Sequence, residues 1–251
     1  METKEIIFTK DHLVETASTN TYLQQLDTDR HLPEGYIVYT DTQRAGRGQR
    51  GNSWESEPGK NLTFSLLLRP EHIPANQQFL LSQAVSLAMT DLLGRYATGF
   101  SIKWPNDIYW EDKKIAGILI ENVLSGTTFA RSIVGIGLNI NQATFVSDAP
   151  NPVSLFQITG HTYDIEAVLD QFVDAFRTRY QQTFTDSARA LREEYAATLY
   201  RNDGEYPYCS EGKTFYASIT GVEPDGHLIL TTDTGEERRF AFKEVSFPRS
   251  H

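Results

Sequence analysis

A basic, glycine-rich stretch from Asp41 to Trp54 has the composition of a loop that binds an anion. It reads D-T-Q-R-A-G-R-G-Q-R-G-N-S-W, with three arginines, three glycines and one acid, in a chain of formal net charge -10. Glycines let backbone N–H groups approach a ligand, and guanidinium groups neutralise charge without losing their own. The stretch predicts a site for a small anionic ligand, although basic glycine-rich loops are more often solvated surface loops.

A second candidate is the lysine-flanked segment from Ser101 to Asn122, S-I-K-W-P-N-D-I-Y-W-E-D-K-K-I-A-G-I-L-I-E-N. Strand-like runs surround the turn chemistry of Pro105-Asn106-Asp107, so Lys103 and Lys114 flank a short, aromatic-rich hairpin. Ammonium groups held there could bind a phosphate group and neutralise its charge. The alternatives are a solvated strand end for each lysine and an ordinary turn for Asn106-Asp107.

Hydroxyls and glycines mark two further positions where a ligand could bind. In E-T-A-S-T-N, Ser18 or Thr19 stands at a strand-to-helix corner, where it either caps the helix or presents a hydroxyl to a polar ligand. The run from Ser132 to Asn141, S-I-V-G-I-G-L-N-I-N, is an apolar strand interrupted by Gly135 and Gly137. Glycine inside a strand suggests a bulge or the close approach of something bound.

The elements that must position these residues divide the chain into a large part and a small part. The 251 residues suffice for one large domain, or for one large and one small. Strands are predicted near residues 6–13, 62–68 and 132–141, and helices over 76–93, 164–184 and 186–200. After Asn202-Asp203-Gly204 the sequence becomes short alternating runs separated by turns, which predicts a small β-barrel of about five strands.

The composition limits the cell compartments and the classes of binding partner that this chain can be expected to have. The chain has no apolar run near the roughly 20 residues that a membrane helix needs, and no secretory signal pattern. Its single cysteine, Cys209, excludes an internal disulfide and a cysteine-based metal cluster. A pI near 5.1 argues against a general nucleic-acid binder. We therefore expect a cytoplasmic protein with no membrane or DNA partner. The sequence leaves the oligomeric state open, with a homodimer among the options.

Five motifs in series resemble those of the biotin protein ligases, the biotin–[acetyl-CoA-carboxylase] ligases. They are E-T-A-S-T-N at 15–20, A-G-R-G-Q-R-G-N-S-W at 45–54, K-W-P-N-D-I-Y at 103–109, K-I-A-G-I-L-I-E at 114–121 and G-I-G-L-N at 135–139. The resemblance implies an α+β fold: a mixed β-sheet catalytic domain flanked by helices (residues 1–203), then a small SH3-like C-terminal β-barrel (204–251). A helix-turn-helix domain would have to precede residue 18, so the expected type is monofunctional, without a DNA-binding domain.

The same resemblance implies a reaction and its reactants. Biotin and ATP, with Mg²⁺, would give biotinyl-5′-AMP and pyrophosphate, and the biotinyl group would pass to a lysine of a biotin carboxyl carrier protein. A basic loop suits this chemistry, because a carboxylate must approach the like charge of a phosphate. The mixed anhydride must also be shielded from water, which favours a loop that closes over it.

By resemblance, the biotin-binding residues are Ser18, Thr19, Asn20, Gln43, Arg47, Gly48, Gln49, Trp104 and Lys114. Ser18, Thr19 and Gln43 would hydrogen-bond the ureido ring. The backbone from Arg47 to Gln49 would hold the carboxylate, and Trp104 would form part of the apolar wall. Lys114 would lie at the acyl-phosphate junction, and the catalytic set would be Lys114, Arg47 and Arg50.

The residues that the resemblance assigns to ATP are Trp54, Lys103, Asn106, Asp107 and Asn139. Trp54 would cover the adenine after the loop closes, and Asn139 would read the adenine edge. The other three would serve the phosphates, with Asp107 the candidate metal ligand.

Two other functions compete with this one. A lipoate or octanoyl transfer protein has a related fold, but its R-R-x-x-G-G-G-x-V-x-H pattern does not occur here. A non-catalytic biotin-binding regulator would not need Lys103 and Lys114 around a phosphate. The sequence also argues against a generic P-loop ATPase, since the motif G-x-x-x-x-G-K-[ST] does not occur.

The loop departs from the family pattern at Gln49, where an arginine that helps to retain the adenylate is usual. We hypothesise that Arg50, the nearest guanidinium on the same loop, replaces it. An Arg50→Ala variant should therefore lose biotinyl-AMP faster than the parent, as measured by the adenylate that stays bound after gel filtration. A variant that formed and held biotinyl-AMP as well as the parent would refute the hypothesis.

Overall fold

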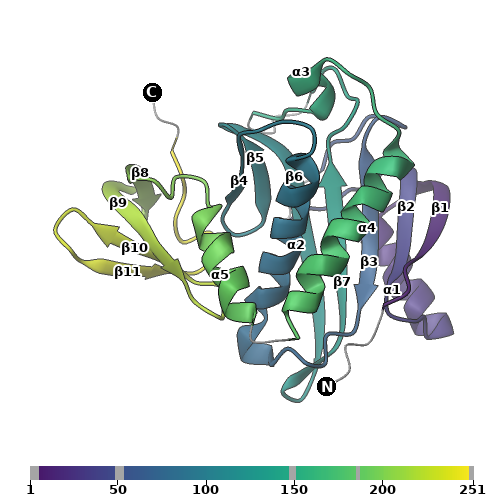
Figure 1. Ribbon diagram of the computed structural model, residues 1–251, viewed down its shortest axis with the longest axis horizontal. Coiled ribbons are helices and arrows are strands. Elements are labelled where there is room, and N and C mark those ends of the chain that lie inside the picture. Colours follow the sequence, from purple (N-terminus) through teal and green to yellow (C-terminus); the bar gives the residue numbers. More distant parts are fainter. Residues whose placement is uncertain (1–5, 49–53, 147–150, 185–186, 249–251) are drawn as a thin grey trace.

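The computed structural model, which describes residues 6–48, 54–146, 151–184 and 187–248, contains a large mixed sheet and a small antiparallel sheet (Figure 1). The strands of the large sheet are β1 (Thr9–Thr16), β2 (Tyr36–Gln43), β3 (Leu62–Leu68), β4 (Phe100–Lys103), β5 (Asp107–Trp110), β6 (Lys113–Ser125) and β7 (Thr128–Leu138). Their order is β1-β2-β3-β7-β6-β5-β4, with β1 and β2 parallel and the other neighbours antiparallel. The predicted mixed sheet is confirmed.

The two faces of the large sheet differ in side-chain character, and β3 shows the difference most clearly. Phe64 and Leu66 belong to the main core beneath the long helices, whereas Leu67 belongs to a smaller cluster with Leu23 and Ile133. Because side chains alternate along a strand, Thr63 and Ser65 share the face of Leu67. One face is therefore apolar throughout, and the other becomes polar toward the start of β3.

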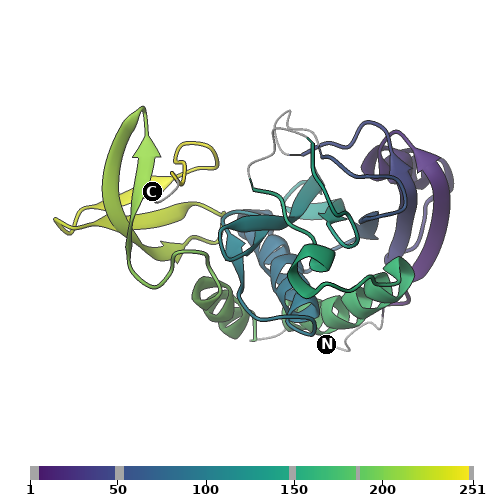
Figure 2. The same ribbon diagram turned by 90° about the horizontal axis from the view of Figure 1, so that it is seen from above.

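Helices cover both faces of this sheet (Figures 1 and 2). Helix α2 (Phe79–Leu93) packs against α4 (Ile165–Gln182) and α5 (Ala188–Ala197), and α1 (Thr19–Arg30) covers β2, β3 and β7 on the opposite face. The predicted helices are confirmed with shifted ends. The short helix α3 (Leu155–Thr159) was not predicted, and the start of the helix predicted over 76–93 is instead a separate 3-10 helix, η2 (Ala75–Gln77). Every described helix falls short of the length or apolarity that spanning a bilayer requires.

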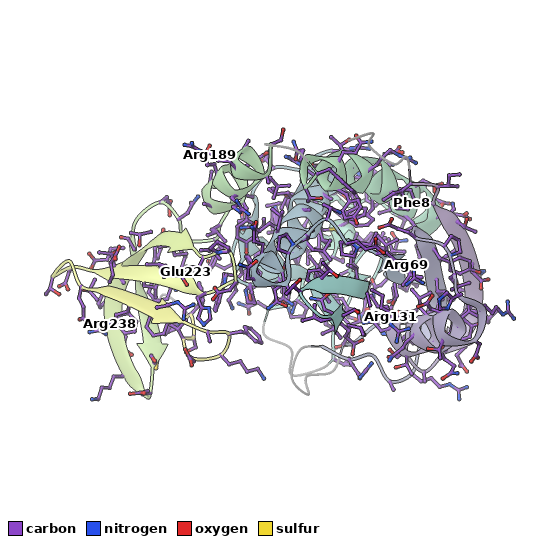
Figure 3. All side chains as sticks on the ribbon, turned by 90° about the horizontal axis from the view of Figure 1, so that it is seen from below. Phe8, Arg69, Arg131, Arg189, Glu223 and Arg238 are labelled. Carbon is purple, nitrogen blue, oxygen red and sulfur yellow. The ribbon has the colours of Figure 1, made fainter. Side chains whose placement is uncertain are left out.

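A buried carboxylate anchors helix α1 to the sheet. Asp27 is 4% exposed and accepts hydrogen bonds from Arg69 Nη2 at 2.6 Å and from Arg131 Nη1 at 3.0 Å. Arg69 follows β3 and Arg131 lies on β7, and Figure 3 labels both on the same side of the molecule. A buried carboxylate with two guanidinium partners resists displacement, so the C-terminal half of α1 is fixed relative to the sheet.

The small sheet is built from β8 (Glu205–Ser210), β9 (Lys213–Val222), β10 (Leu228–Thr232) and β11 (Glu237–Phe240), in the order β11-β10-β9-β8. About five strands closed into a barrel were predicted, but the described residues form four strands and no closed barrel. Turns after β11 interrupt the ladder, and the chain then returns to β8 through one isolated bridge between Ser246 and Cys209. The proposed domain division after residue 203 lies just before β8 and stays a prediction.

The connection between the sheets also covers an edge of the large one. Ile102 N donates to Thr198 O and Tyr200 N donates to Ile102 O, both at 2.9 Å. The segment after α5 therefore satisfies backbone groups of β4, the edge strand, before the chain enters the small sheet.

His72 lies in an aromatic setting at the end of α4. Its ring stacks on Phe184 with centroids 3.5 Å apart, and its Nε2 lies 2.8 Å from Thr183 Oγ1. Because that hydroxyl donates to Tyr180 O, Nε2 of His72 carries a proton and donates to Thr183 Oγ1. Burial lowers the pKa of His72 from 6.5 to about 4.

This pKa shift predicts a specific loss of stability in acid. Between pH 6.5 and about 4 the unfolded chain binds a proton at His72 that the folded chain does not, so the free energy of unfolding falls as the pH falls through this window. We expect a contribution of about 2 kcal/mol after allowing for partial exposure. Urea unfolding at pH 7 and at pH 4.5 should show that the free energy of unfolding falls less between these pH values for His72→Phe than for the parent. His161→Gln, at an exposed histidine, should behave like the parent; equal losses in all three would contradict the assignment.

Candidate functional site

One pocket of about 550 Å³ opens on the polar face of the large sheet and collects most of the residues singled out from the sequence. Those that line it are Ser18, Thr19, Asn20, Gln43, Arg47, Gly48, Trp54, Lys103, Trp104, Asn106, Asp107 and Lys114. Asn139 does not line it, and Gln49 and Arg50 lie outside the described residues. The volume lies within the range of small-molecule sites.

The floor of the pocket is an area of the sheet with little side-chain volume. Gly117 on β6 pairs with Gly137 on β7, which pairs with Thr63 on β3. In the next row of the same face, Gly135 pairs with Ser65. Neighbouring strands lie about 4.8 Å apart, so these small residues form a continuous surface on which a flat ligand can lie.

Two side chains approach this floor closely, as the glycines in the sequence suggested. A Cβ atom on Gly135 would lie 2.2 Å from Asn20 Oδ1, and one on Gly137 would lie 2.3 Å from Trp54 Cε2. Neither glycine coincides with a register shift of β7, so close approach explains both glycines and a bulge explains neither.

At one end of the floor, α1 presents a polar group of side chains. Ser18 is the N-cap of α1, but its side chain makes no capping hydrogen bond. Thr19 N donates to Gln43 Oε1 at 2.9 Å, and Ser65 Oγ donates to Thr19 Oγ1 at 2.7 Å. These bonds orient the Gln43 amide so that its Oε1 is engaged and its Nε2 remains a donor. The Ser18 hydroxyl and the Gln43 amide can therefore address a neutral polar ring.

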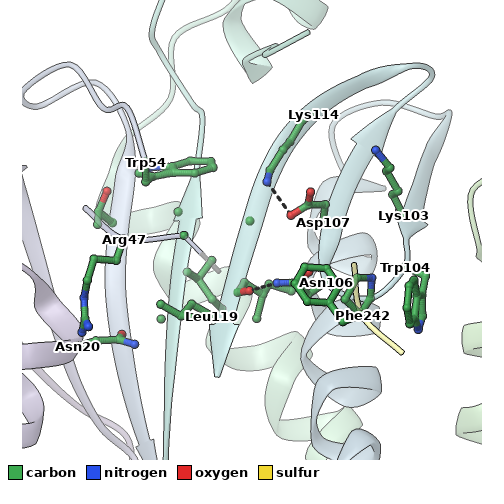
Figure 4. Close-up of a pocket in the computed structure, with 18 of the residues that line it drawn as sticks. Asn20, Arg47, Trp54, Lys103, Trp104, Asn106, Asp107, Lys114, Leu119 and Phe242 are labelled. Atoms are coloured by element: carbon green, nitrogen blue, oxygen red, sulfur yellow. Dashed lines mark hydrogen bonds and ion pairs between the residues drawn. The ribbon is translucent and has the colours of Figure 1, made fainter. Parts of the chain in front are cut away.

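At the other end lie two lysines (Figure 4). Lys114 Nζ is 2.6 Å from Asp107 Oδ1, and the side chains are each 27% exposed. Lys103 Nζ donates to Tyr109 OH at 2.9 Å and lies 5.4 Å from the ring centroid of Phe247. Burial lowers the pKa of the Lys103 ammonium, and the nearby Asp107 opposes that shift. Two cations with one carboxylate leave this end able to bind an anion.

Arg47 extends toward the opposite end, beside Asn20 and across the floor from Lys114 (Figure 4). Its Nη2 donates to Thr21 Oγ1 at 3.1 Å and lies 3.5 Å from Glu121 Oε1. Glu121 also accepts from Asn20 Nδ2 at 2.7 Å. The guanidinium of Arg47 is therefore tied to the α1 corner, and its predicted catalytic role stays a prediction.

Asn106 and Trp104 make firm contacts within the protein. The side-chain amide of Asn106 donates to Ile118 O, while Ile118 N donates to Asn106 O at 3.1 Å. Trp104 Nε1 donates to Gly226 O at 2.9 Å, and its ring meets Phe242 edge-on. Asn106 therefore ties the turn to β6, and Trp104 joins the pocket wall to the small sheet.

Thr63 Oγ1 on the floor and two further buried polar atoms near it have no hydrogen-bond partner in the described protein. Trp54 Nε1 lies over Gly137, and Asn139 Oδ1 remains unsatisfied although Asn139 Nδ2 donates to Val153 O at 3.0 Å. Buried polar groups are nearly always paired, so both residues favour a missing partner such as a ligand. Their assignment to adenine stays a prediction.

The sequence did not point to two contributors to the site. Glu121 was part of a quoted motif but had no assigned role, although alternation along β6 from Gly117 places it on the pocket face. The segment from Phe242 to Phe247 also lines the pocket. It reaches the site through the placement of the small sheet, for which local sequence carries no signal.

A divalent cation would have a narrow choice of ligands in this pocket. Among the described residues, the one group of three close candidate ligands is Glu223, Asp225 and His227, which lies outside the pocket. Arg239 pairs with both carboxylates of that group, which argues against a metal there. Within the pocket Asp107 is a fitting ligand, because Mg²⁺ often binds one carboxylate together with substrate phosphates.

Comparison with known proteins places the chain among acyl-group ligases. The sequence model of the Biotin/lipoate A/B protein ligase family matches residues 14–139. The biotin–[acetyl-CoA-carboxylase] ligase of Paracoccus denitrificans is 34% identical over 235 residues, which cover 90% of this chain and 95% of that protein. The bifunctional ligase/repressor BirA of Bacillus subtilis (strain 168) is 31% identical over 223 residues, and the chain spans 66% of its length.

Solved structures agree with the sequence comparison. The biotin protein ligase from Aquifex aeolicus in complex with biotin and ATP superposes with a TM-score of 0.75 at 27% identity, and the match covers 96% of this chain and 99% of that one. The fold of the large sheet and the small sheet is thus shared with a ligase of known ligands.

Gly135 offers a direct test of how the floor is packed. In Gly135→Ala the new methyl group must displace Asn20, which Ser65 and Glu121 hold, so we expect a loss of about 1–3 kcal/mol in the free energy of unfolding. Denaturant titration measures this loss. The control is Gly221→Ala, at a β9 position where a Cβ meets nothing within 4 Å and a change below about 1 kcal/mol is expected. Equal effects would show that the floor does not depend on the absence of a side chain.

Proposed function

The chain belongs to the Biotin/lipoate A/B protein ligase family, and from this membership we propose that it is an ATP-dependent biotin protein ligase. It would adenylate biotin to biotinyl-5′-AMP and transfer the biotinyl group to a lysine of a biotin carboxyl carrier protein or carboxylase subunit. The proposal includes cytoplasmic residence.

One observation carries the proposal: a single pocket joins a neutral polar end at Ser18 and Gln43 to a cationic end at Lys114 and Lys103, across a floor of glycines. Biotin has the matching shape, with a neutral ureido ring at one end and a carboxylate at the other. The phosphates of ATP would then lie beside the lysines, next to that carboxylate.

In the first half-reaction a carboxylate oxygen of biotin attacks the α-phosphorus of ATP, and the bond to the β-phosphate oxygen breaks to release pyrophosphate. Lys114 would neutralise the two approaching anions, and Asp107 holds its ammonium in place before they arrive. Lys103, on the adjoining strand, would stabilise the phosphate charge. In proposing these roles for Lys114 and Lys103 we rely on their position in the pocket and on the motif resemblance.

In the second half-reaction the neutral amine of the acceptor lysine attacks the acyl carbon and releases a proton as the amide forms. The acyl carbon–oxygen bond of the anhydride breaks, and AMP leaves with its electrons. Lys114 again faces the leaving phosphate. Trp54 would shield the anhydride from water, because its ring lies over Gly117 and Gly137 on the floor.

Mg²⁺ fits the site as an ion that binds together with the nucleotide, and not as one that the protein binds alone. Asp107 would hold it together with phosphate oxygens, and the ion would supply charge neutralisation on those oxygens. Among the described lining residues Asp107 is the acidic one, so the nucleotide itself must provide most of the remaining ligands.

The decisive experiment for the function is transfer of labelled biotin to a carrier domain, with and without ATP. We expect transfer that requires ATP, together with ATP–pyrophosphate exchange that requires biotin and that lipoate does not support. Exchange with lipoate in place of biotin would assign the protein to the lipoate branch of the family, and no exchange with either acid would remove the enzymatic assignment.

Lys114→Met tests the role of the cationic end. We expect biotin-dependent exchange to fall by about a hundredfold or more, because one preorganised charge at the reacting phosphate is lost. Asp107→Asn, which keeps the shape but not the charge of the lysine's partner, should cause a smaller fall. Lys213→Met on the exposed start of β9 is the control; an active Lys114→Met enzyme would exclude the proposed role.

A further inference from the structure

Arg201, in the connection between α5 and β8, is a buried cation to which neither the motifs nor the proposed mechanism gives a role. Its residue is 7% exposed, and its backbone has a φ of 65°. Among the described residues no carboxylate forms an ion pair with it. A guanidinium that is buried without a carboxylate needs other compensation, so the position of its acceptors is informative.

The acceptors of Arg201 are backbone carbonyls of β8 and of the segment that follows β11 and returns to β8. Nη2 donates to Pro248 O at 2.7 Å and Nη1 donates to Pro207 O at 3.2 Å. The rings of Tyr200 and Tyr206 lie 5.1 and 5.3 Å from its Cζ, which adds cation–π attraction. One planar fork thus joins the last described residue of the chain to β8.

The segment that Arg201 holds forms part of the pocket wall. Ser246 N donates to Cys209 O at 2.8 Å and Cys209 N donates to Ser246 O at 3.0 Å, so the segment has one bridge of its own to β8. Val245, Ser246 and Phe247 line the pocket. The Phe247 ring packs edge-on against Tyr208 and lies 5.4 Å from Lys103 Nζ.

Two backbone hydrogen bonds of one isolated bridge are a weak attachment for a wall, because such a bridge has no neighbouring ladder to support it. The Arg201 fork adds a second attachment two residues further along. With both in place, Phe247 is fixed beside Lys103 and limits the positions that the ammonium can take.

We propose that Arg201 is a positioning residue that fixes the segment from Val245 to Pro248 as the wall beside Lys103, and so sets the affinity of the site for the phosphates of the nucleotide. The inference rests on the proposed function, because it assumes that Lys103 meets nucleotide phosphates. Arg201 itself touches neither substrate.

Arg201→Met tests the inference, because it keeps the apolar stem and removes both donors. In ATP–pyrophosphate exchange we expect the KM for ATP to rise about tenfold, as for a displaced binding group, while the KM for biotin stays within about twofold of the parent value. Hydrogen exchange followed by mass spectrometry should show faster exchange in the peptide that covers residues 241–248.

Three further variants test whether the effect comes from the two hydrogen bonds of Arg201 and not from its charge, from general destabilisation or from loss of any surface arginine. Arg201→Lys keeps the charge but cannot span both carbonyls, so it should resemble Arg201→Met. Phe247→Leu leaves Arg201 in place. It should raise the KM for ATP, while hydrogen exchange at the backbone amide of Cys209 stays slow. Arg238→Met removes an arginine of the small sheet that stacks on Phe215 and pairs with Glu236, and its kinetics should match those of the parent (Figure 3).

Three outcomes would overturn the inference in an otherwise active enzyme. The first is unchanged hydrogen exchange in Arg201→Met. The second is faster hydrogen exchange in this variant with an unchanged KM for ATP, and the third is an equal rise in its KM for ATP and for biotin. Parental kinetics in Arg201→Lys would also overturn it, since charge alone would then suffice. Failure of the proposed function looks different, because the unmutated protein would then show no biotin-dependent exchange at all.

Discussion

The bare area on one face of the large sheet is the constraint on which the site depends. Gly117, Gly135 and Gly137 leave room on β6 and β7 beside β3, and no other residue type would admit Asn20 and Trp54 as closely. Glycine in a strand costs stability, because it packs nothing and loses more backbone freedom on folding. The opposite face offsets this loss, since Phe64, Leu66 and their neighbours on β7 are fully buried under α2 and α4. One face therefore holds the sheet together and leaves the other available for a ligand.

Three described cations around this area, Arg47, Lys114 and Lys103, each have a partner within the protein. Arg47 meets Glu121, Lys114 meets Asp107, and Lys103 meets the hydroxyl and ring of Tyr109. Each contact orients its cation in advance, which reduces the reorganisation needed when an anion arrives. This local arrangement reconciles an anion-binding pocket with a chain whose net charge is -10.

The parts of the site that could be predicted from sequence are those that local pattern determines. Glycines within an apolar run indicated close approach, and a hydroxyl before an amphipathic helix indicated a corner, so Gly135 and Ser18 were found. Glu121 and Arg201 were missed because their partners lie far away in the chain or are backbone carbonyls, which no spacing rule reveals. The predicted closed barrel failed for a related reason. Alternating runs predict strands, but whether the last segment completes a ladder depends on turns such as the one at Lys243, where φ is 75°.

The segment from Thr198 to Arg201 ties together two units that could otherwise melt independently. Its backbone lies along the edge of β4 as far as Tyr200, and the next residue, Arg201, holds the segment that follows β11 through its guanidinium. Loosening the small sheet would therefore loosen the edge of the large one, and the reverse also holds. The chain should behave as one cooperative folding unit rather than as two tandem modules. A sheet too small to be robust alone would in this way gain the thermal resistance of its larger neighbour.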